Sequence, residues 1–205
     1  MGVVAPIEIS PELRARINET IVAPSVAHLK KSNLLYRGVL YIGLMITPKG
    51  PSVLEYNARF GDPEAQAILP LLEGDWGLVF KEVADGRLPK LTWKKASSCC
   101  VVLAAEGYPD SPVKGAPISG LDLDPIREGE SSGANARSYV LHAGTARDSE
   151  GEWTTNGGRV LSVMGIGSDM QSAISSAYSA ADTISWSGMQ FRTDIGAKVT
   201  AGRNK

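Results

Sequence analysis

The residues best suited to chemistry lie in one short stretch, VLEYNARFGDPEAQ, at positions 53–66. It combines carboxylates, an amide and a guanidinium: Glu55, Asn57, Arg59, Asp62 and Glu64. Carboxylate and amide oxygens are hard ligands that suit Mg²⁺, which proteins usually hold through one or two groups plus phosphates. An arginine close by can grip a phosphate or an acyl phosphate through two parallel hydrogen bonds. The stretch therefore indicates a site for the phosphate end of a nucleotide, with a metal ion between protein and phosphates.

The first half of this stretch is expected to be a β-strand with its polar residues on one face. Alternate side chains of a strand share a face, so Glu55, Asn57 and Arg59 should point the same way. Val53 is expected on that face too. The other face holds apolar residues that we expect to anchor the strand in a core: Leu54, Tyr56, Ala58 and Phe60. A solvated surface strand with a Glu–Arg ion pair would show the same pattern.

The preceding run, YRGVLYIGLMIT at positions 36–47, is almost entirely apolar and is expected to be a strand buried on both faces. The turn PKGP would join it to the polar strand as an antiparallel hairpin. A polar face beside a buried strand needs partners, which favours the functional interpretation of the stretch.

The sequence GDPE, which follows, is typical of a helix start. Asp62 is expected to be the N-cap, Pro63 the first helical residue, and Glu64 a first-turn residue near the positive end of the helix. A well-made helix start accounts for these residues by itself. The amides of the first turn could also help to hold an anion.

The rest of the chain predicts an α+β fold in two parts, with a boundary near residue 96. The first part should contain a helix that begins at Ser10 and Pro11 and breaks or kinks at Pro24, and another that stops at Gly86. After residue 96 the sequence predicts short strands in a small mixed sheet, with a helix at 168–185 packed on it.

Composition excludes several classes of protein. The 205 residues are 43% hydrophobic and 21% charged, and 21 Lys and Arg balance 22 Asp and Glu, so we expect no nucleic-acid partner. The apolar runs are too short to cross a bilayer. Cys99 and Cys100 are neighbours in a strand-like run, where side chains face opposite ways, so we expect two core-filling thiols in a reducing, cytoplasmic environment.

Further candidates lie in the second part. In TTNGGRV, Gly157 and Gly158 would allow a ligand close to the backbone and Arg159 could bind phosphate or carboxylate, although Asn-Gly is also a strong hairpin signal. His142 could take part in acid–base chemistry or be structural. In RTDIG, Arg192 and Asp194 could line a pocket or form a plain ion pair.

The run from YRGVLYIGLMIT through NARFGDPEAQ resembles the second half of the ATP-grasp core of the phosphoribosylamine–glycine ligase (glycinamide ribonucleotide synthetase) family. The later runs VVLAAEGYP, HAGT, TNGGRVLSV and MQFRTDIG resemble the C-terminal domain of that family, in the same order. The resemblance extends over nearly the whole chain. It implies that residues 1–95 are the C-terminal portion of an ATP-grasp domain, an antiparallel sheet with helices, and that 96–200 are a small mixed β-rich C-terminal domain.

The resemblance also implies a reaction and roles for residues. ATP would phosphorylate glycine, and 5-phosphoribosylamine would attack the glycyl phosphate, giving glycinamide ribonucleotide, ADP and phosphate. Glu55 and Asn57 would hold Mg²⁺ (or Mn²⁺) against ATP, and Arg59 would steady the transferring phosphoryl group or the acyl phosphate. The residues implied near substrate are Asp62, Glu64, Gly157, Gly158 and Arg159.

The family's N-terminal domain and nucleotide lid have no counterpart in the printed sequence. We therefore expect a fragment or one half of a split enzyme, with Met1 matching an internal position and the missing parts supplied in cis or in trans. The isolated chain is expected to be inactive. The alternative is a folded, non-catalytic fragment or pairing module.

Overall fold

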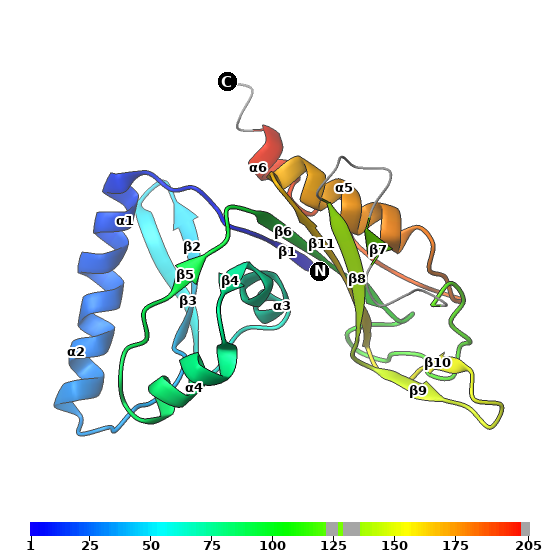
Figure 1. Cartoon of the computed structure of the whole chain (residues 1–205), viewed down its shortest axis with the longest axis horizontal. Coiled ribbons are helices and arrows are strands. Elements are labelled where there is room, and N and C mark those ends of the chain that lie inside the picture. The colour runs from blue at the N-terminus through cyan, green and yellow to red at the C-terminus, as the bar shows by residue number, and fades with distance from the viewer. Residues whose placement is uncertain (122–126, 129–135, 202–205) are drawn as a thin grey trace. The chain divides into compact units, whose positions relative to one another are not determined.

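The computed structural model of the chain describes residues 1–121, 127–128 and 136–201, and it has the expected α+β class (Figure 1). The described chain forms two compact units. Unit 1 comprises Met1–Pro6, Pro63–Leu72 and Trp93–Lys205, and unit 2 comprises Ile7–Asp62 and Glu73–Thr92. Neither unit is one continuous segment. The division into 1–95 and 96–200 stays a prediction about domains of the family.

Unit 1 is built on a five-stranded sheet in the order β1-β6-β11-β8-β7, in which each neighbouring pair is antiparallel. These strands are Gly2–Ala5 (β1), Ser97–Ala104 (β6), Arg159–Gly167 (β11), Arg137–His142 (β8) and Arg127–Glu128 (β7). The central strands β6 and β11 are buried almost throughout, as their continuous apolar runs predict. Strand β1 was not predicted, because only its long-range pairing with β6 makes this short segment a strand.

Helix α5 (Met170–Ala181) covers one face of this sheet and confirms the helix predicted at 168–185 (Figure 1). Its N-cap is Asp169, whose carboxylate accepts a hydrogen bond from the Ser172 amide at 2.8 Å. The helix lies very close to β11. A Cβ atom on Gly165 would lie 2.1 Å from the Ala173 carbonyl oxygen, so only glycine fits there.

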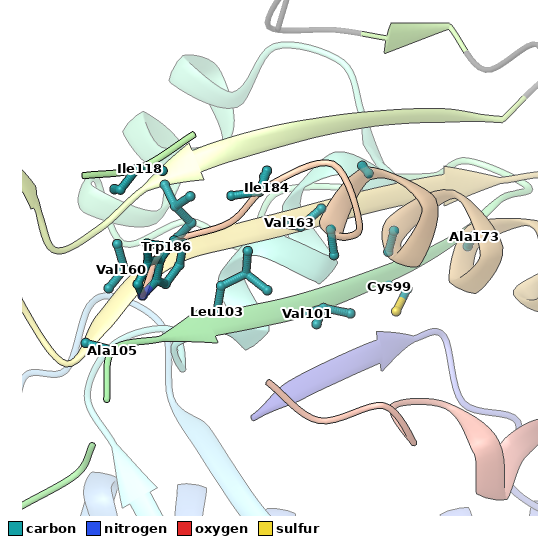
Figure 2. Close-up of a cluster of buried hydrophobic side chains, with 14 residues drawn as sticks. Cys99, Val101, Leu103, Ala105, Ile118, Val160, Val163, Ala173, Ile184 and Trp186 are labelled. Carbon is teal, nitrogen blue, oxygen red and sulfur yellow. The ribbon is translucent and has the colours of Figure 1, made fainter. Parts of the chain in front are cut away.

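The main core lies between β6, β11 and α5, and Figure 2 shows its side chains interleaved from all three elements. A smaller cluster on the opposite face packs beneath α3 (Glu64–Ile68), and it contains Ala67, Cys100, Val102 and Met164. Neither cysteine forms a disulfide, and both are fully buried on opposite faces, as predicted. Burial raises the pKa of the Cys99 thiol to about 12, so this thiol is chemically inert in the folded chain.

Four smaller features complete unit 1 and the points where the chain passes to unit 2. Strands β9 (Thr145–Arg147) and β10 (Trp153–Thr155) form an antiparallel hairpin. The 3₁₀ turn η2 (Leu69–Leu71) follows α3, and α6 (Ala197–Ala201) is the last described helix. The short pair β4 (Leu72–Glu73) and β5 (Thr92–Trp93) lies where the chain passes from one unit to the other.

Unit 2 begins with a continuous helical segment made of α1 (Pro11–Ile17), a π-helical turn η1 (Asn18–Val22) and α2 (Ala23–Lys31). Ser10 caps it as predicted, with its hydroxyl oxygen accepting from the Leu13 amide at 3.2 Å. Of the predicted break or kink at Pro24, the break does not occur, because the helical path continues to Lys31. The π turn widens the backbone just before the proline, which is how a helical path tolerates a residue without an N–H group.

Strands β2 (Tyr41–Thr47) and β3 (Gly50–Asn57) form the predicted antiparallel hairpin of unit 2. Helix α4 (Trp76–Ala84) follows later, is capped by Asp75, and is ended by Gly86 in a left-handed conformation (φ +79°), as predicted.

The prediction that β2 is buried on both faces is wrong. Met45 and Ile46 are each 51% exposed, and Ile21 is the single buried apolar side chain among the described residues of unit 2. The physical reason is that a two-stranded sheet with one helical segment against it cannot cover both of its faces within the unit.

Candidate functional site

The cross-strand register of β2 and β3 sets the direction of the polar side chains. Glu55 lies directly opposite Gly43, and Asn57 lies opposite Tyr41. Side chains that lie opposite each other in an antiparallel pair share a face. The register shifts by one residue next to Gly43, so that Leu44 pairs with Val53. An extra residue in a strand reverses the alternation beyond it. Val53 therefore lies on the face opposite Glu55, contrary to the prediction.

Glu55 and Asn57 meet on their common face. The Asn57 side-chain amide donates a hydrogen bond from Nδ2 to Glu55 Oε1 over 2.9 Å. An ionised carboxylate can only accept, so the amide must present its nitrogen to Glu55 and keep its oxygen as an acceptor for another group. The pair offers a carboxylate and an amide oxygen on one side of the hairpin, as strand alternation predicts.

Arg59 does not share that strand face, because β3 ends at Asn57 and Arg59 lies in the bend that follows. Its guanidinium donates from Nη1 to the Phe60 carbonyl at 2.7 Å. The three-residue polar row predicted from alternation is thus a pair followed by a loop arginine. Alternation holds only while the backbone stays extended.

Tyr56 was predicted to be buried, and it is 51% exposed. Its hydroxyl lies 2.8 Å from the Ser25 hydroxyl on α2, so the end of the ring touches the side of this helix. The ring is not enclosed. Leu54, at the register shift, is 63% exposed. Phe60 is half-buried and meets Phe80 edge-on at 6.4 Å between ring centroids. The polar face was therefore predicted better than the apolar one.

The GDPE sequence begins helix α3 one residue later than predicted. Pro63 occupies the N-cap position without a side-chain cap, and Glu64 is the first helical residue. Asp62 is therefore not the N-cap, although Glu64 lies in the first turn as expected. The helix is short because it tightens into the 3₁₀ turn around Pro70. Asp62 belongs to unit 2 and Glu64 to unit 1.

The glycines of the NGGR sequence are used for close packing of the chain on itself. A Cβ atom on Gly158 would lie 2.5 Å from the Tyr108 ring, and one on Gly144 would lie 2.7 Å from the Gly157 Cα. Strand β10 pairs with β9, so Asn156 and Gly157 do not form the two-residue hairpin turn that was the alternative. Arg159 begins β11, and its Nη1 lies 3.8 Å from the Met1 sulfur.

His142 and the Arg192–Asp194 pair both have structural partners. The His142 ring stacks on Trp153 at 4.2 Å, and its Nδ1 lies 3.0 Å from the Thr145 hydroxyl. Burial, and then the nearby Arg147, lower the pKa of His142. Arg192 donates from Nε to Asp194 at 2.7 Å, and the hydrogen bonds from Arg192 lower the pKa of Asp194.

The structure thus brings the candidate residues together in two local groups. Glu55 and Asn57 touch within unit 2, with Arg59 and Asp62 further along the same chain segment. Gly157, Gly158 and Arg159 are consecutive in unit 1. Sequence reasoning missed Gly43, which lies opposite Glu55. A lone glycine inside an apolar strand is the signal that could have found it.

The donor chemistry of the Glu55–Asn57 pair fits Mg²⁺ or Mn²⁺. Both offer oxygen, the donor that these hard cations prefer. The described part of the chain holds no group of three or more His, Cys, Asp and Glu that could enclose a metal ion. Two protein oxygens are typical of a Mg²⁺ site that is completed by phosphates.

The fold and this site define a class of protein first. A biotin carboxylase domain from Hydrogenobacter thermophilus superposes on 92% of this chain with a TM-score of 0.54 at 20% sequence identity, which indicates a shared fold alone. The family model "Phosphoribosylglycinamide synthetase, ATP-grasp (A) domain" matches residues 1–65, and "Phosphoribosylglycinamide synthetase, C domain" matches residues 98–198. The chain belongs to the phosphoribosylglycinamide synthetase family, whose members are also called phosphoribosylamine–glycine ligases.

Individual relatives of the chain agree with this family assignment. The chain is 42% identical to the phosphoribosylamine–glycine ligase of a Nostoc species over 98% of its own length, and 44% identical to that of Caulobacter vibrioides over 89%. The crystal structure of the Thermotoga maritima phosphoribosylamine–glycine ligase superposes on 95% of the chain, with a TM-score of 0.76 and 34% identity. The chain spans 46%, 42% and 46% of these proteins, a little under half of each.

Proposed function

We propose that the chain is the C-terminal half of a phosphoribosylamine–glycine ligase. The complete enzyme would use ATP to join glycine to 5-phosphoribosylamine, giving glycinamide ribonucleotide, ADP and phosphate through glycyl phosphate. Membership of the family supports the reaction. The single structural observation that carries it is the contact between Glu55 and Asn57, which presents two oxygen donors on one face of the hairpin.

In this proposal Glu55 and Asn57 hold the divalent cation, Mg²⁺ or Mn²⁺. A bound cation would neutralise charge on the ATP phosphates during transfer. Arg59, in the loop after β3, is proposed to stabilise the transferring phosphoryl group or the acyl phosphate through its guanidinium. Because the loop arginine is not fixed in the strand ladder, it can adjust to a phosphate more freely than Glu55 can.

The remaining candidates are proposed to bind substrate. Asp62 and Glu64 follow the metal edge directly in the chain, whereas Gly157, Gly158 and Arg159 come from unit 1. The close packing of Gly157 against Gly144 gives this segment a rigid backbone, and Arg159 is its charged group. A rigid backbone with one guanidinium suits recognition of the carboxylate of glycine or the phosphate of phosphoribosylamine.

The partner in this proposal is the part of the ligase that the chain does not match, with its N-terminal domain and nucleotide lid, in cis or in trans. Adenine and most phosphate contacts would come from the lid. Mg²⁺ binds a two-donor edge mainly through phosphates that it shares with the nucleotide. Residues 1–205 alone are therefore expected to show negligible ligase activity and very weak ATP affinity. No described helix has both the length and the apolar content to span a bilayer; a cytoplasmic location stays a prediction.

The test is phosphate release that depends on ATP, glycine and phosphoribosylamine, measured with residues 1–205 alone and after addition of the N-terminal half of a related ligase. Restored turnover supports the proposal, and turnover by the isolated chain would contradict it. In the restored complex Glu55→Gln should lower the rate roughly 10²-fold by weakening the hold on the metal. The exposed Glu19→Gln on the helical segment is the matched control and should change little. Proper docking without turnover would favour the non-catalytic alternative.

A further inference from the structure

Gly43 occupies an unusual place in the hairpin. It is buried, although Met45 on the same strand is half-exposed and Glu55 directly opposite is exposed. The atoms that cover it belong to its neighbours. A Cβ atom built on Gly43 would lie 3.0 Å from Glu55 Cγ and 3.7 Å from Cε1 of the Tyr41 ring. The side chain of Glu55 therefore lies across the bare backbone of the neighbouring strand.

The backbone conformation of Gly43 does not explain why it is glycine. Its φ angle lies outside the left-handed region, so any residue could adopt it. Glycine inside a strand weakens the strand, so its presence needs another reason. The space above its Cα supplies one, since 3.0 Å is closer than a Cβ and a side-chain carbon normally approach.

This arrangement determines where the Glu55 carboxylate lies. With its Cγ over Gly43, Glu55 reaches forward along β3 and accepts a hydrogen bond from the amide of Asn57 at 2.9 Å. The register shift next to Gly43 adds to this, because such a shift re-aims the side chains that follow it. A side chain at position 43 would push Glu55 away from β2 and away from Asn57.

We propose that Gly43 is a positioning residue for the Glu55–Asn57 pair. Its missing side chain lets Glu55 lie across β2 and hold the Asn57 amide by its nitrogen, which leaves the amide oxygen to act as the second donor toward a divalent cation. The placement of Glu55 stands on the geometry alone, and the role toward a cation rests on the proposed function.

The test compares two valine substitutions on the same face of β2 in the chain of residues 1–205. Gly43→Val lies opposite Glu55, whereas the control Met45→Val lies opposite Ser52 and should not touch Glu55. The first readout is the side-chain amide signal of Asn57 in ¹⁵N–¹H NMR spectra, with Glu55→Ala as the reference for a lost hydrogen bond. If Gly43→Val does not fold, Gly43→Ala replaces it in the test, because its smaller side chain disturbs the hairpin less.

We expect Gly43→Val to move the Asn57 side-chain signal to its position in Glu55→Ala, Gly43→Ala to move it part of the way, and Met45→Val to leave it unchanged. An unchanged signal in folded Gly43→Val would overturn the inference. The second readout is broadening of the same signal by Mn²⁺ in the complex with the N-terminal half and ATP, which should need about tenfold more Mn²⁺ in Gly43→Val than in wild type. If the signal moves as expected but Mn²⁺ broadens it in neither protein, the positioning of Glu55 stands and the proposed metal role fails.

Discussion

The two units of this chain differ in how they use apolar residues. Unit 1 buries a continuous cluster between its sheet and α5, whereas the described residues of unit 2 bury one apolar side chain, Ile21. Unit 2 also contains most of the exposed large apolar residues, including Leu35, Met45, Ile46, Leu54 and Leu88. The proposed metal edge, Glu55 and Asn57, lies in unit 2. The comparison teaches that the proposed metal edge lies in the part with the weaker core of its own, while unit 1 holds the larger core.

Glycine shows the same contrast on a smaller scale. In unit 1, Gly165 brings the β11 backbone against α5, and its replacement would collide with backbone atoms. In unit 2, Gly43 makes room for the exposed, movable side chain of Glu55. The first glycine serves packing and stability, and the second serves the position of a polar group.

The largest difference is expected in the order of unfolding. In residues 1–205 alone, unit 2 should open before unit 1, because few buried apolar contacts hold it. Limited proteolysis should cut within residues 7–62 or 73–92 at least about tenfold faster than within β6 or β11. Cys99 and Cys100 should resist thiol reagents until unit 1 unfolds, since both are fully buried. Thiol labelling at the same denaturant concentration as the first cuts would contradict this order.

A matched pair of leucine truncations should show the difference in free energy. Leu103→Ala removes a fully buried side chain from β6 and should lower the free energy of unfolding by about 2–5 kcal/mol. Leu54→Ala, at a site that is 63% exposed, should change it by less than about 0.5 kcal/mol. Urea unfolding of unit 1, monitored by labelling of Cys99 and Cys100, measures the loss of free energy in Leu103→Ala. Equal effects would show that the exposure of Leu54 does not describe the chain in solution.

A pair of glycine substitutions should separate tight packing from open packing. Gly165→Ala should cost about 1–3 kcal/mol or more, because its Cβ would lie 2.1 Å from the Ala173 carbonyl oxygen. Gly77→Ala in α4 meets only Asp75 Oδ1 at 3.1 Å and gains helix propensity, so it should stay within about 1 kcal/mol of wild type. Thermal unfolding of both variants measures this, and a tolerated Gly165→Ala would refute the close contact of α5 with β11.

The smallest expected effect is the pH dependence of stability that His142, whose ring packs on Trp153, contributes. Burial, and then Arg147, hold the pKa of His142 below its ordinary value in the folded chain. The unfolded chain therefore binds the proton first as pH falls, so the contribution of His142 is present above about pH 6.5 and is lost below it. NMR titration of the ring should show the lowered pKa, and Arg147→Gln should raise it part of the way. His142→Asn should reduce the loss of stability between about pH 7 and about pH 5.

Local patterns predicted much of the fold and part of the site. The cap at Ser10, the stop at Gly86, the hairpin and helix α5 all follow from short-range rules of spacing and turn chemistry. The contact between Glu55 and Asn57 follows from alternation over two residues. Arg59 and Val53 were misplaced, because the strand ends at Asn57 and the register shifts beside Gly43. The lone Gly43 was a local signal of the shift, and it was missed.

The sequence by itself determined which residues could do chemistry, that Glu55 and Asn57 lie on one hairpin, and that the chain resembles a ligase family in an ordered set of motifs. Only the tertiary structure decided that β1 joins β6, that Gly157 and Gly158 pack against Gly144 and Tyr108, and that Glu55 lies across Gly43. The physical reason is the separation along the chain of the residues that interact. Helix caps, turns and alternation depend on neighbours within a few residues, whereas strand partners, register shifts and close backbone contacts depend on which distant segments meet.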